Sequence, residues 1–406
     1  MQKILIILSF SLLLSYDSYI SFYGSGQKLS KLNPSNISLG WSNLFDSNNQ
    51  YKIGSLSHFY QSDLVRFTMA GDFNFNSIND VNYYSQKFNY FSFLFPLKKH
   101  KYSLGISLAP FYRINSHIIE SDFGYVEQNE NNSAYAYKSE YEFDGGPSIA
   151  SIMFSSSLFN NQHLNFSWGL KFNYIFGSLY SHVQNNIYNI DYDQEGNVEM
   201  IFDDSEYYTA INNYDGYGLE IEFSIKNKHH NLISSINLVD EININRSFYD
   251  DIVPEALELG ISPDEEKAYT LSSPFEFNIG YSFNFNDKNA IIFEYYYYSP
   301  YTADSGFNLF NNEDVNKNRL SMGYYRNLFD DKINFSTGLY HIEADNDFLS
   351  SNRKGMTFGL GIYFIKSMSI DFCIEIGQNK IEITNPLTED YVNVYLGFTT
   401  SDRWFK

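Results

Sequence analysis

YVNVYLGFTTSDRWFK, residues 391–406, is a stretch in which apolar and polar side chains alternate. One row of this alternation comprises Val392, Val394, Leu396 and Phe398, and the other comprises Asn393, Tyr395, Gly397 and Thr399. A β-barrel in lipid must be apolar outside, while its interior can be polar. The stretch therefore predicts a membrane-barrel strand with the first row facing lipid, and Trp404 and Phe405 are predicted interface anchors.

The same alternation recurs along the chain, which separates this interpretation from a single half-buried strand of a soluble sandwich. It is sharpest in 163–184, where Phe166, Trp168 and Leu170 alternate with Ser167 and Gly169. Fourteen candidate strands are 64–75, 86–96, 101–119, 147–158, 163–184, 206–227, 230–246, 272–285, 289–301, 316–328, 331–343, 354–366, 369–382 and 391–400. An even number is what a single-chain bacterial barrel requires if both termini lie on the periplasmic side.

Connection length gives a second signal, because tight turns alternate with long polar stretches. The stretches interpreted as extracellular loops are 120–146, 185–205, 247–271, 302–315, 344–353 and 383–390. Short periplasmic turns and longer extracellular loops are typical of outer-membrane barrels. The fold prediction is therefore all-β: a transmembrane antiparallel β-barrel of about fourteen strands, with a hatch formed by the N-terminal segment inside the lumen.

Composition agrees with a barrel in the outer membrane of a Gram-negative bacterium. The chain has 36 Tyr and 37 Phe among 406 residues, and amphipathic rings suit the two membrane–water interfaces. The formal net charge of -21 excludes nucleic acid as a partner. Acidic runs at Asp191–Asp204, Asp250–Glu266 and Asp304–Asp314 are interpreted as solvated loops.

The N-terminal region predicts export. Residues 1–20 contain Lys3 and the apolar run Ile4–Leu14, which is the pattern of a signal peptide with an uncertain cleavage site. Residues 21–62 remain after the strands are counted and are interpreted as a hatch or plug in the lumen, with a disordered tail as the alternative. The barrel then occupies residues 63–406.

Charged residues on the inward rows are the candidate functional side chains. The lumen-facing candidates are Arg66, Asp72, Lys171, Glu220, Glu222, Glu276, Glu294, Arg319, Asp371 and Glu375. One interpretation is a network of salt bridges that stabilises the barrel and anchors the plug. The other is a polar path that favours cations, because acidic side chains outnumber basic ones.

Catalytic and metal sites are not expected. The eight His residues are scattered, so no Ser–His arrangement of a barrel hydrolase is indicated. The run from Asp191 to Gly196 begins like a calcium loop but has Phe202 where the bidentate Glu should stand. We therefore predict a protein that is not an enzyme and has no metal or cofactor.

Several short motifs resemble the long-chain fatty acid transporter (FadL-like) family of outer-membrane barrels, especially divergent members from Bacteroidetes-type and marine bacteria. The motifs are Asn33-Pro34-Ser35, Gly145-Gly146-Pro147, residues 169–177 and Arg403-Trp404-Phe405. The resemblance implies a fourteen-stranded barrel in which Asn33 and Pro34 belong to the hatch. It also implies uptake of hydrophobic molecules by lateral diffusion through a gap in the wall.

The predicted function is uptake of hydrophobic or amphipathic small molecules across the outer membrane. Two alternatives remain: a structural or secretion-associated barrel (type IX-like) with a closed lumen, and a general porin. The expected partners are the lipid bilayer, lipopolysaccharide, a hydrophobic small-molecule ligand and, through the C-terminal strand, the barrel-assembly machinery.

Overall fold

The structure is a computed structural model and describes residues 27–28, 33–43, 55–78, 81–98, 101–128, 131–161, 163–192, 198–250, 262–271, 275–299, 316–345, 350–365, 368–382 and 386–402. The predicted signal peptide, Trp404 and Phe405 lie outside these residues, as does part of the predicted hatch. Among the described residues, no helix has the length and apolar character needed to cross a membrane.

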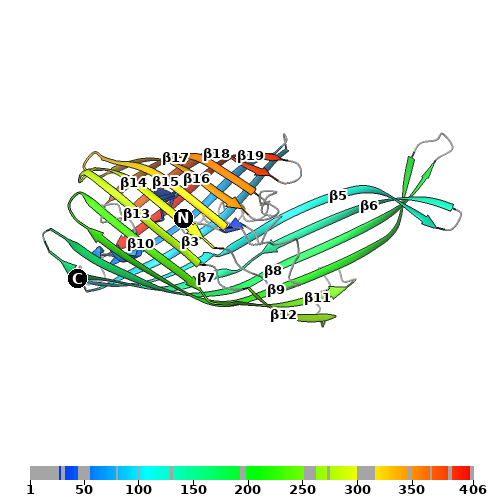
Figure 1. Cartoon of the computed structure of the whole chain (residues 1–406), viewed down its shortest axis with the longest axis horizontal. Coiled ribbons are helices and arrows are strands. Elements are labelled where there is room, and N and C mark those ends of the chain that lie inside the picture. Colours follow the sequence, from blue (N-terminus) through cyan, green and yellow to red (C-terminus); the bar gives the residue numbers. More distant parts are fainter. Residues whose placement is uncertain are drawn as a thin grey trace.

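Fourteen strands of the described chain pair in an antiparallel ring (Figure 1). They are β2 (Val65–Ile78), β3 (Val81–Lys98), β4 (Tyr102–Pro110), β7 (Ser148–Asn160), β8 (Asn165–Tyr192), β9 (Val198–Lys226), β10 (His230–Val239), β13 (Phe275–Asn286), β14 (Asn289–Tyr298), β15 (Asn316–Leu328), β16 (Ile333–Asp345), β17 (Ser350–Ile365), β18 (Met368–Glu382) and β19 (Leu387–Asp402). The barrel closes where β19 pairs with β2, from Glu389 opposite Ile78 to Asp402 opposite Val65. The predicted fold class is confirmed.

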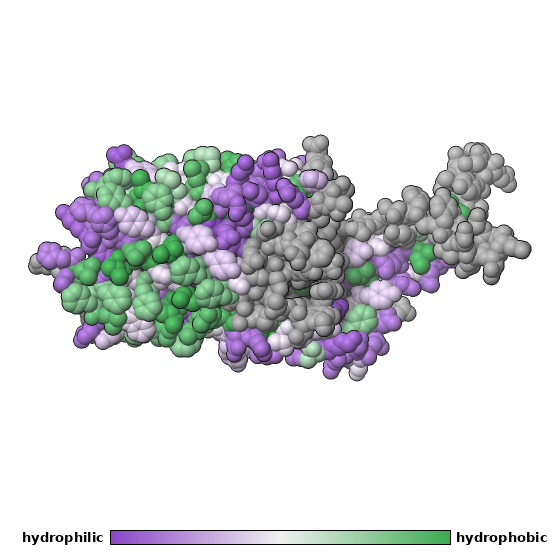
Figure 2. All heavy atoms as spheres, viewed as in Figure 1, coloured by the Kyte–Doolittle hydropathy of each residue, from purple (hydrophilic) through white to green (hydrophobic). Residues whose placement is uncertain are grey.

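The alternation in the final strand matches the two faces of the wall. Val392 and Leu396 are exposed, whereas Tyr391 and Tyr395 are buried. Large hydrophobic side chains gather on the outside of the barrel (Figure 2), among them Phe172, which is 57% exposed. An apolar outer surface of this kind is the surface that lipid covers.

Three predicted loops are instead largely β-structure that projects past one end of the barrel (Figure 1). The additional strands are β5 (Tyr112–Gln128), β6 (Asn131–Gly145), β11 (Ile242–Asp250) and β12 (Glu265–Leu271). With the outer parts of β8 and β9 they form a six-stranded sheet in the order β12-β11-β9-β8-β6-β5. We call it the extracellular sheet, after the side of the membrane that the sequence predicts for these segments. The prediction of loops at 120–146 and 185–205 was wrong because strand pairing continues past the barrel, and the described residues of 247–271 also belong mainly to strands.

The lengths of two strands show how far the extracellular sheet reaches. β8 has 28 residues and β9 has 29, whereas about 9–11 residues cross a membrane. Both strands therefore continue well beyond the lipid.

A bend separates the extracellular sheet from the barrel at the β4–β5 and β6–β7 junctions. Gly145 and Gly146 have φ values of 102° and 120°, which favour glycine. The backbone N–H of Phe111 donates to the Pro147 carbonyl at 2.8 Å. Arg113 reinforces the bend, since its guanidinium donates to the Gly146 carbonyl and to the Ser148 hydroxyl.

Candidate functional site

Two described parts of the N-terminal segment pack against the inner wall of the barrel, whereas a third, β1 (Gln27–Lys28), pairs with β5 at Tyr112 and Arg113. The two parts are the helix α3 (Pro34–Ile37) with the residues that follow it to Asn43, and the 3-10 helix η1 (Leu56–Gln61). α3 contacts β17, β18 and β19, while η1 contacts β3, β4, β7, β8 and β9. We call residues 33–43 and 55–62 the lumen segment.

The helix α3 owes its start to two residues that the sequence suggested for the hatch. Asn33 is the N-cap, and its side chain accepts a hydrogen bond of 3.2 Å from the Ser35 backbone N–H. Pro34 occupies the first helical turn, where its lack of an N–H costs nothing. Both residues are buried, and Pro34 lies against Gly397 of β19.

Glycines in the wall make room for the lumen segment. A Cβ added at Gly323 would meet Leu39, one at Gly338 would meet Gly40, and one at Gly359 would meet Ser38. Gly323 and Gly338 are opposite each other in the β15–β16 ladder. Glycine within a strand often marks the close approach of another backbone, and here that backbone is residues 38–40.

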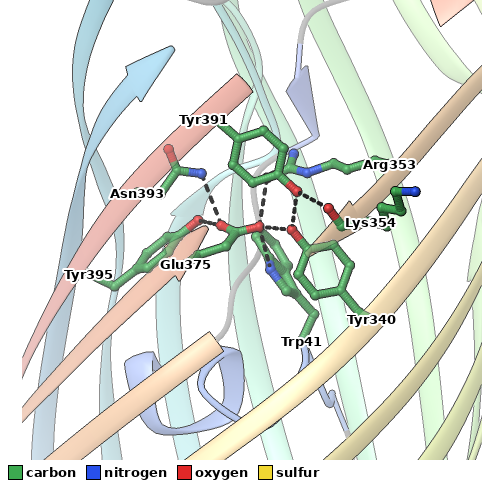
Figure 3. Close-up of polar contacts among 8 residues, drawn as sticks. All are labelled: Trp41, Tyr340, Arg353, Lys354, Glu375, Tyr391, Asn393 and Tyr395. Carbon is green, nitrogen blue, oxygen red and sulfur yellow. Dashed lines mark hydrogen bonds and ion pairs between the residues drawn. The ribbon is translucent and has the colours of Figure 1, made fainter. Parts of the chain in front are cut away.

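Glu375 on β18 is the centre of a hydrogen-bond network that joins barrel side chains to the lumen segment (Figure 3). The indole Nε1 of Trp41 donates to Glu375 Oε1 at 3.0 Å. From the barrel itself, the carboxylate accepts hydrogen bonds from Arg353 (2.8 Å), Asn393 (2.9 Å), Tyr395 (2.6 Å) and Tyr340. The Glu375 side chain is fully buried, so these donors replace water around its charge.

Aromatic contacts hold the indole over this carboxylate. Trp41 meets Tyr340 and Tyr395 edge-on, at centroid distances of 6.2 and 6.1 Å. The Arg353 guanidinium lies 5.5 Å from the Trp41 ring, within the range of a cation–π interaction. Trp41 also packs against a buried cluster of Ile37, Cys373 and Tyr395.

Two further glutamates of the wall accept hydrogen bonds from the lumen segment. Glu294 on β14 accepts from the Ser42 hydroxyl (2.8 Å), the Asn43 backbone N–H (3.0 Å) and Arg319 (2.8 Å). Glu222 on β9 accepts from the Ser57 backbone N–H and hydroxyl, both at 2.7 Å. The lumen segment is thus attached at three buried carboxylates on different strands.

An apolar cluster of buried residues lies where the barrel meets the extracellular sheet. Its buried members are Ala70, Tyr90, Ala109, Phe111, Tyr112, Ile149, Ile175, Val239, Ile242, Ile244 and Leu271. They come from strands on both sides of β8 in the ring, so Phe111 and Tyr112 at the bend point into the barrel. The hydroxyls of Tyr112 and Tyr298 form a hydrogen bond of 2.7 Å, which links the bend to β14.

The remaining candidates from the sequence occupy other parts of the inner wall. Lys171 and Glu220 form a salt bridge of 2.8 Å, and Glu276 accepts a hydrogen bond from Tyr296 at 3.0 Å. Arg66, Asp72 and Asp371 are also buried. Sequence reasoning missed Arg353 because the predicted strand began at residue 354. Within the described residues, no group of three His, Cys, Asp or Glu side chains could hold a metal ion.

The closed antiparallel ring and its apolar outer surface define a membrane-spanning β-barrel. A family model described as BamG matches residues 4–406, and the chain belongs to this family. No curated protein sequence matches the chain.

Solved structures with a similar fold include a FadL homologue, a hydrocarbon channel and a toluene transporter. A Pseudomonas aeruginosa FadL homologue has 10% identity and a TM-score of 0.57, covering 94% of this chain and 100% of its own. The CymD monoaromatic hydrocarbon channel has 13% identity and a TM-score of 0.53, with coverages of 92% and 98%. The P. putida toluene transporter TodX has 11% identity and a TM-score of 0.50, with coverages of 95% and 99%. At these identities the likeness shows the fold alone.

Proposed function

We propose that this protein is a structural outer-membrane barrel that works as a component of the barrel-assembly machinery. The observation that carries the proposal is the attachment of the lumen segment to Glu222, Glu294 and Glu375. A conducting barrel needs a free path through its lumen, so the lumen segment would have to move away. That movement would remove hydrogen-bond donors from buried carboxylates, which is energetically costly. The name of the matching family, BamG, agrees with a role in assembly.

The buried apolar cluster that contains Phe111 and Tyr112 supports the same proposal, because the Tyr112 hydroxyl reaches the Tyr298 hydroxyl of β14. Contacts between strands that are not neighbours in the ring favour a barrel that supports a neighbouring protein over a barrel that conducts.

Affinity isolation and depletion test the proposal. Tagged protein extracted under mild conditions is expected to co-isolate with the barrel-assembly proteins, and depletion is expected to lower the amounts of unrelated barrel proteins in the outer membrane. The purified protein is expected to give no steady conductance in planar bilayers. Normal levels of other barrels after depletion, with no co-isolated assembly protein, would contradict the proposal.

Uptake of hydrophobic molecules is the second candidate, and one feature of the wall favours it. In the described chain, β4 pairs with β3 only along Phe91–Lys98, because the chain leaves the wall at Pro110. The upper part of β3 pairs with β2 alone, so a hydrophobic solute could pass the wall there. Depletion would then slow accumulation of a radiolabelled aromatic hydrocarbon and leave other barrel proteins at normal levels.

A further inference from the structure

The outer part of the extracellular sheet carries an apolar patch that lipid does not reach. Tyr188 and Ile190 on β8 pair with Phe202 and Met200 on β9, so the four side chains share one face. Phe202 is 57% exposed and Met200 is 51% exposed, and the rings of Tyr188 and Phe202 meet edge-on at 5.9 Å. We call these four residues the tip patch.

A polar belt separates the tip patch from the lipid-facing wall. On the same face of β8, between Tyr174 and Tyr188, lie His182, Gln184 and Asn186. Fourteen residues of strand span about 45 Å at about 3.3 Å per residue. The extracellular sheet continues past the end of the barrel (Figure 1), so the tip patch stands in water. Exposed apolar patches in such a position mark interaction sites.

The charge of the extracellular sheet selects the partner. Segments 114–144, 178–215 and 240–271, which contain most of the residues of this sheet, hold 24 of the 48 acidic residues but only 3 of the 27 basic ones. The rest of the chain has 24 of each, so the net charge of -21 resides in these three segments. Asp203 and Asp204, directly beside the tip patch, are exposed.

We propose that the tip patch and its acidic surroundings dock a protein that presents a basic surface with apolar side chains outside the membrane. Lipopolysaccharide and a second copy of this chain are both anionic and are repelled by the same charges. A basic partner gains the electrostatic attraction, and its apolar side chains cover Met200 and Phe202. That the partner belongs to the assembly machinery rests on the proposed function, whereas the chemistry of the surface does not.

Two defined peptides test the chemistry on the full-length protein in lipid nanodiscs. One alternates Lys and Leu, and the other alternates Glu and Leu. We expect only the Lys/Leu peptide to bind, and we expect the double variant Met200→Ser/Phe202→Ser to weaken it by about tenfold, as loss of interface anchors does. Equal binding of the Glu/Leu peptide would overturn the charge argument.

Two matched variants separate the apolar patch from general acidity. Ile201→Ser changes a residue of the same strand that is 46% exposed but lies on the opposite face, and it is expected to leave binding within about twofold. Asp203→Asn/Asp204→Asn is expected to weaken binding and to reduce its dependence on salt. If the tip-patch variant binds as well as the wild type, the proposal is wrong.

Photocrosslinking in cells identifies the occupant. A photoreactive amino acid at position 202 is expected to crosslink to a discrete protein with a basic surface, and one at position 201 is not. Crosslinks only to lipopolysaccharide or to a second copy would overturn the proposal.

Co-isolation separates failure of this inference from failure of the proposed function. If Met200→Ser/Phe202→Ser retains the assembly proteins as fully as the wild type, the docking surface is wrong and the proposed function stands. If the wild type retains none, the proposed function fails, and peptide binding still decides the chemistry of the tip patch.

Discussion

The attachment of the lumen segment at Glu375 can be tested with the single cysteine of the chain. Cys373 is buried beneath the lumen segment, in the cluster with Ile37 that Trp41 packs against. A water-soluble maleimide entering the lumen can react with this thiol only after the segment moves away. The labelling rate of Cys373 therefore reports the fraction of molecules in which the segment is released.

Trp41→Ala removes the attachment without changing the wall. It deletes a hydrogen bond to a carboxylate, the contact with the Arg353 guanidinium and two edge-on ring contacts. Together these are worth about 3 kcal/mol, because hydrogen bonds to charged groups contribute about 1.5–3 kcal/mol and ring contacts add to them. At 1.4 kcal/mol per tenfold change, the released fraction and the labelling rate should rise about 150-fold.

Two variants control the experiment. Trp41→Phe keeps a ring but loses the Nε1 donor, and Glu375 keeps its four donors from the barrel, so labelling should rise only about tenfold. Leu360→Ala changes an exposed residue on the lipid face and should leave the rate unchanged. Equal labelling of Trp41→Ala and wild type would refute the attachment, and an equal rise in Leu360→Ala would show a general loosening instead.

Three further changes probe other parts of the molecule. Gly338→Val places side-chain atoms where the Gly40 backbone lies, so an overpacking cost of about 1–3 kcal/mol should raise Cys373 labelling at least about fivefold. Leu396→Arg puts a charge in the lipid-facing row and should lower the free energy of unfolding in lipid vesicles by about 2–4 kcal/mol, measured with urea. Tyr112→Phe should lower the free energy of unfolding by about 1 kcal/mol in the same assay. A double-mutant cycle with Tyr298→Phe should give a coupling free energy of about the same size between the two hydroxyls.

The barrel could be predicted from sequence because lipid imposes a rule on every strand that crosses it. Phe172 and Leu396 must be apolar, while their neighbours Lys171 and Tyr395 can be polar, and this contrast repeats with period two. The extracellular sheet has water on its surfaces, so neither of its faces has to be apolar. Asn185, Asn186 and Asn189 are polar on both faces of β8, so the predicted strand ended at residue 184 and a loop was predicted from 185, whereas β8 continues to Tyr192.

The attachment of the lumen segment could not be predicted because its partners are remote in sequence. Trp41 and Glu375 are separated by 334 positions, and no local pattern links an indole to one inward carboxylate among several. A weaker signal was present in the wall. Gly323, Gly338 and Gly359 interrupt strands on the inward row, and glycines at such positions indicate that another backbone comes close.

The distribution of charge disfavours edge pairing between copies of the extracellular sheet. A sheet edge offers unpaired N–H and C=O groups to any neighbouring strand, and β12 and β5 are the outer strands of the sheet, with β1 pairing β5 only at Tyr112 and Arg113. The 24 acidic residues in its three segments repel the same segments of another copy. This repulsion acts only between like charges, so a basic protein is attracted to the sheet while a second copy is kept away. Neutralising Asp203 and Asp204 should therefore weaken heterologous docking and, at low salt, increase self-association of the purified protein, which sedimentation velocity would measure.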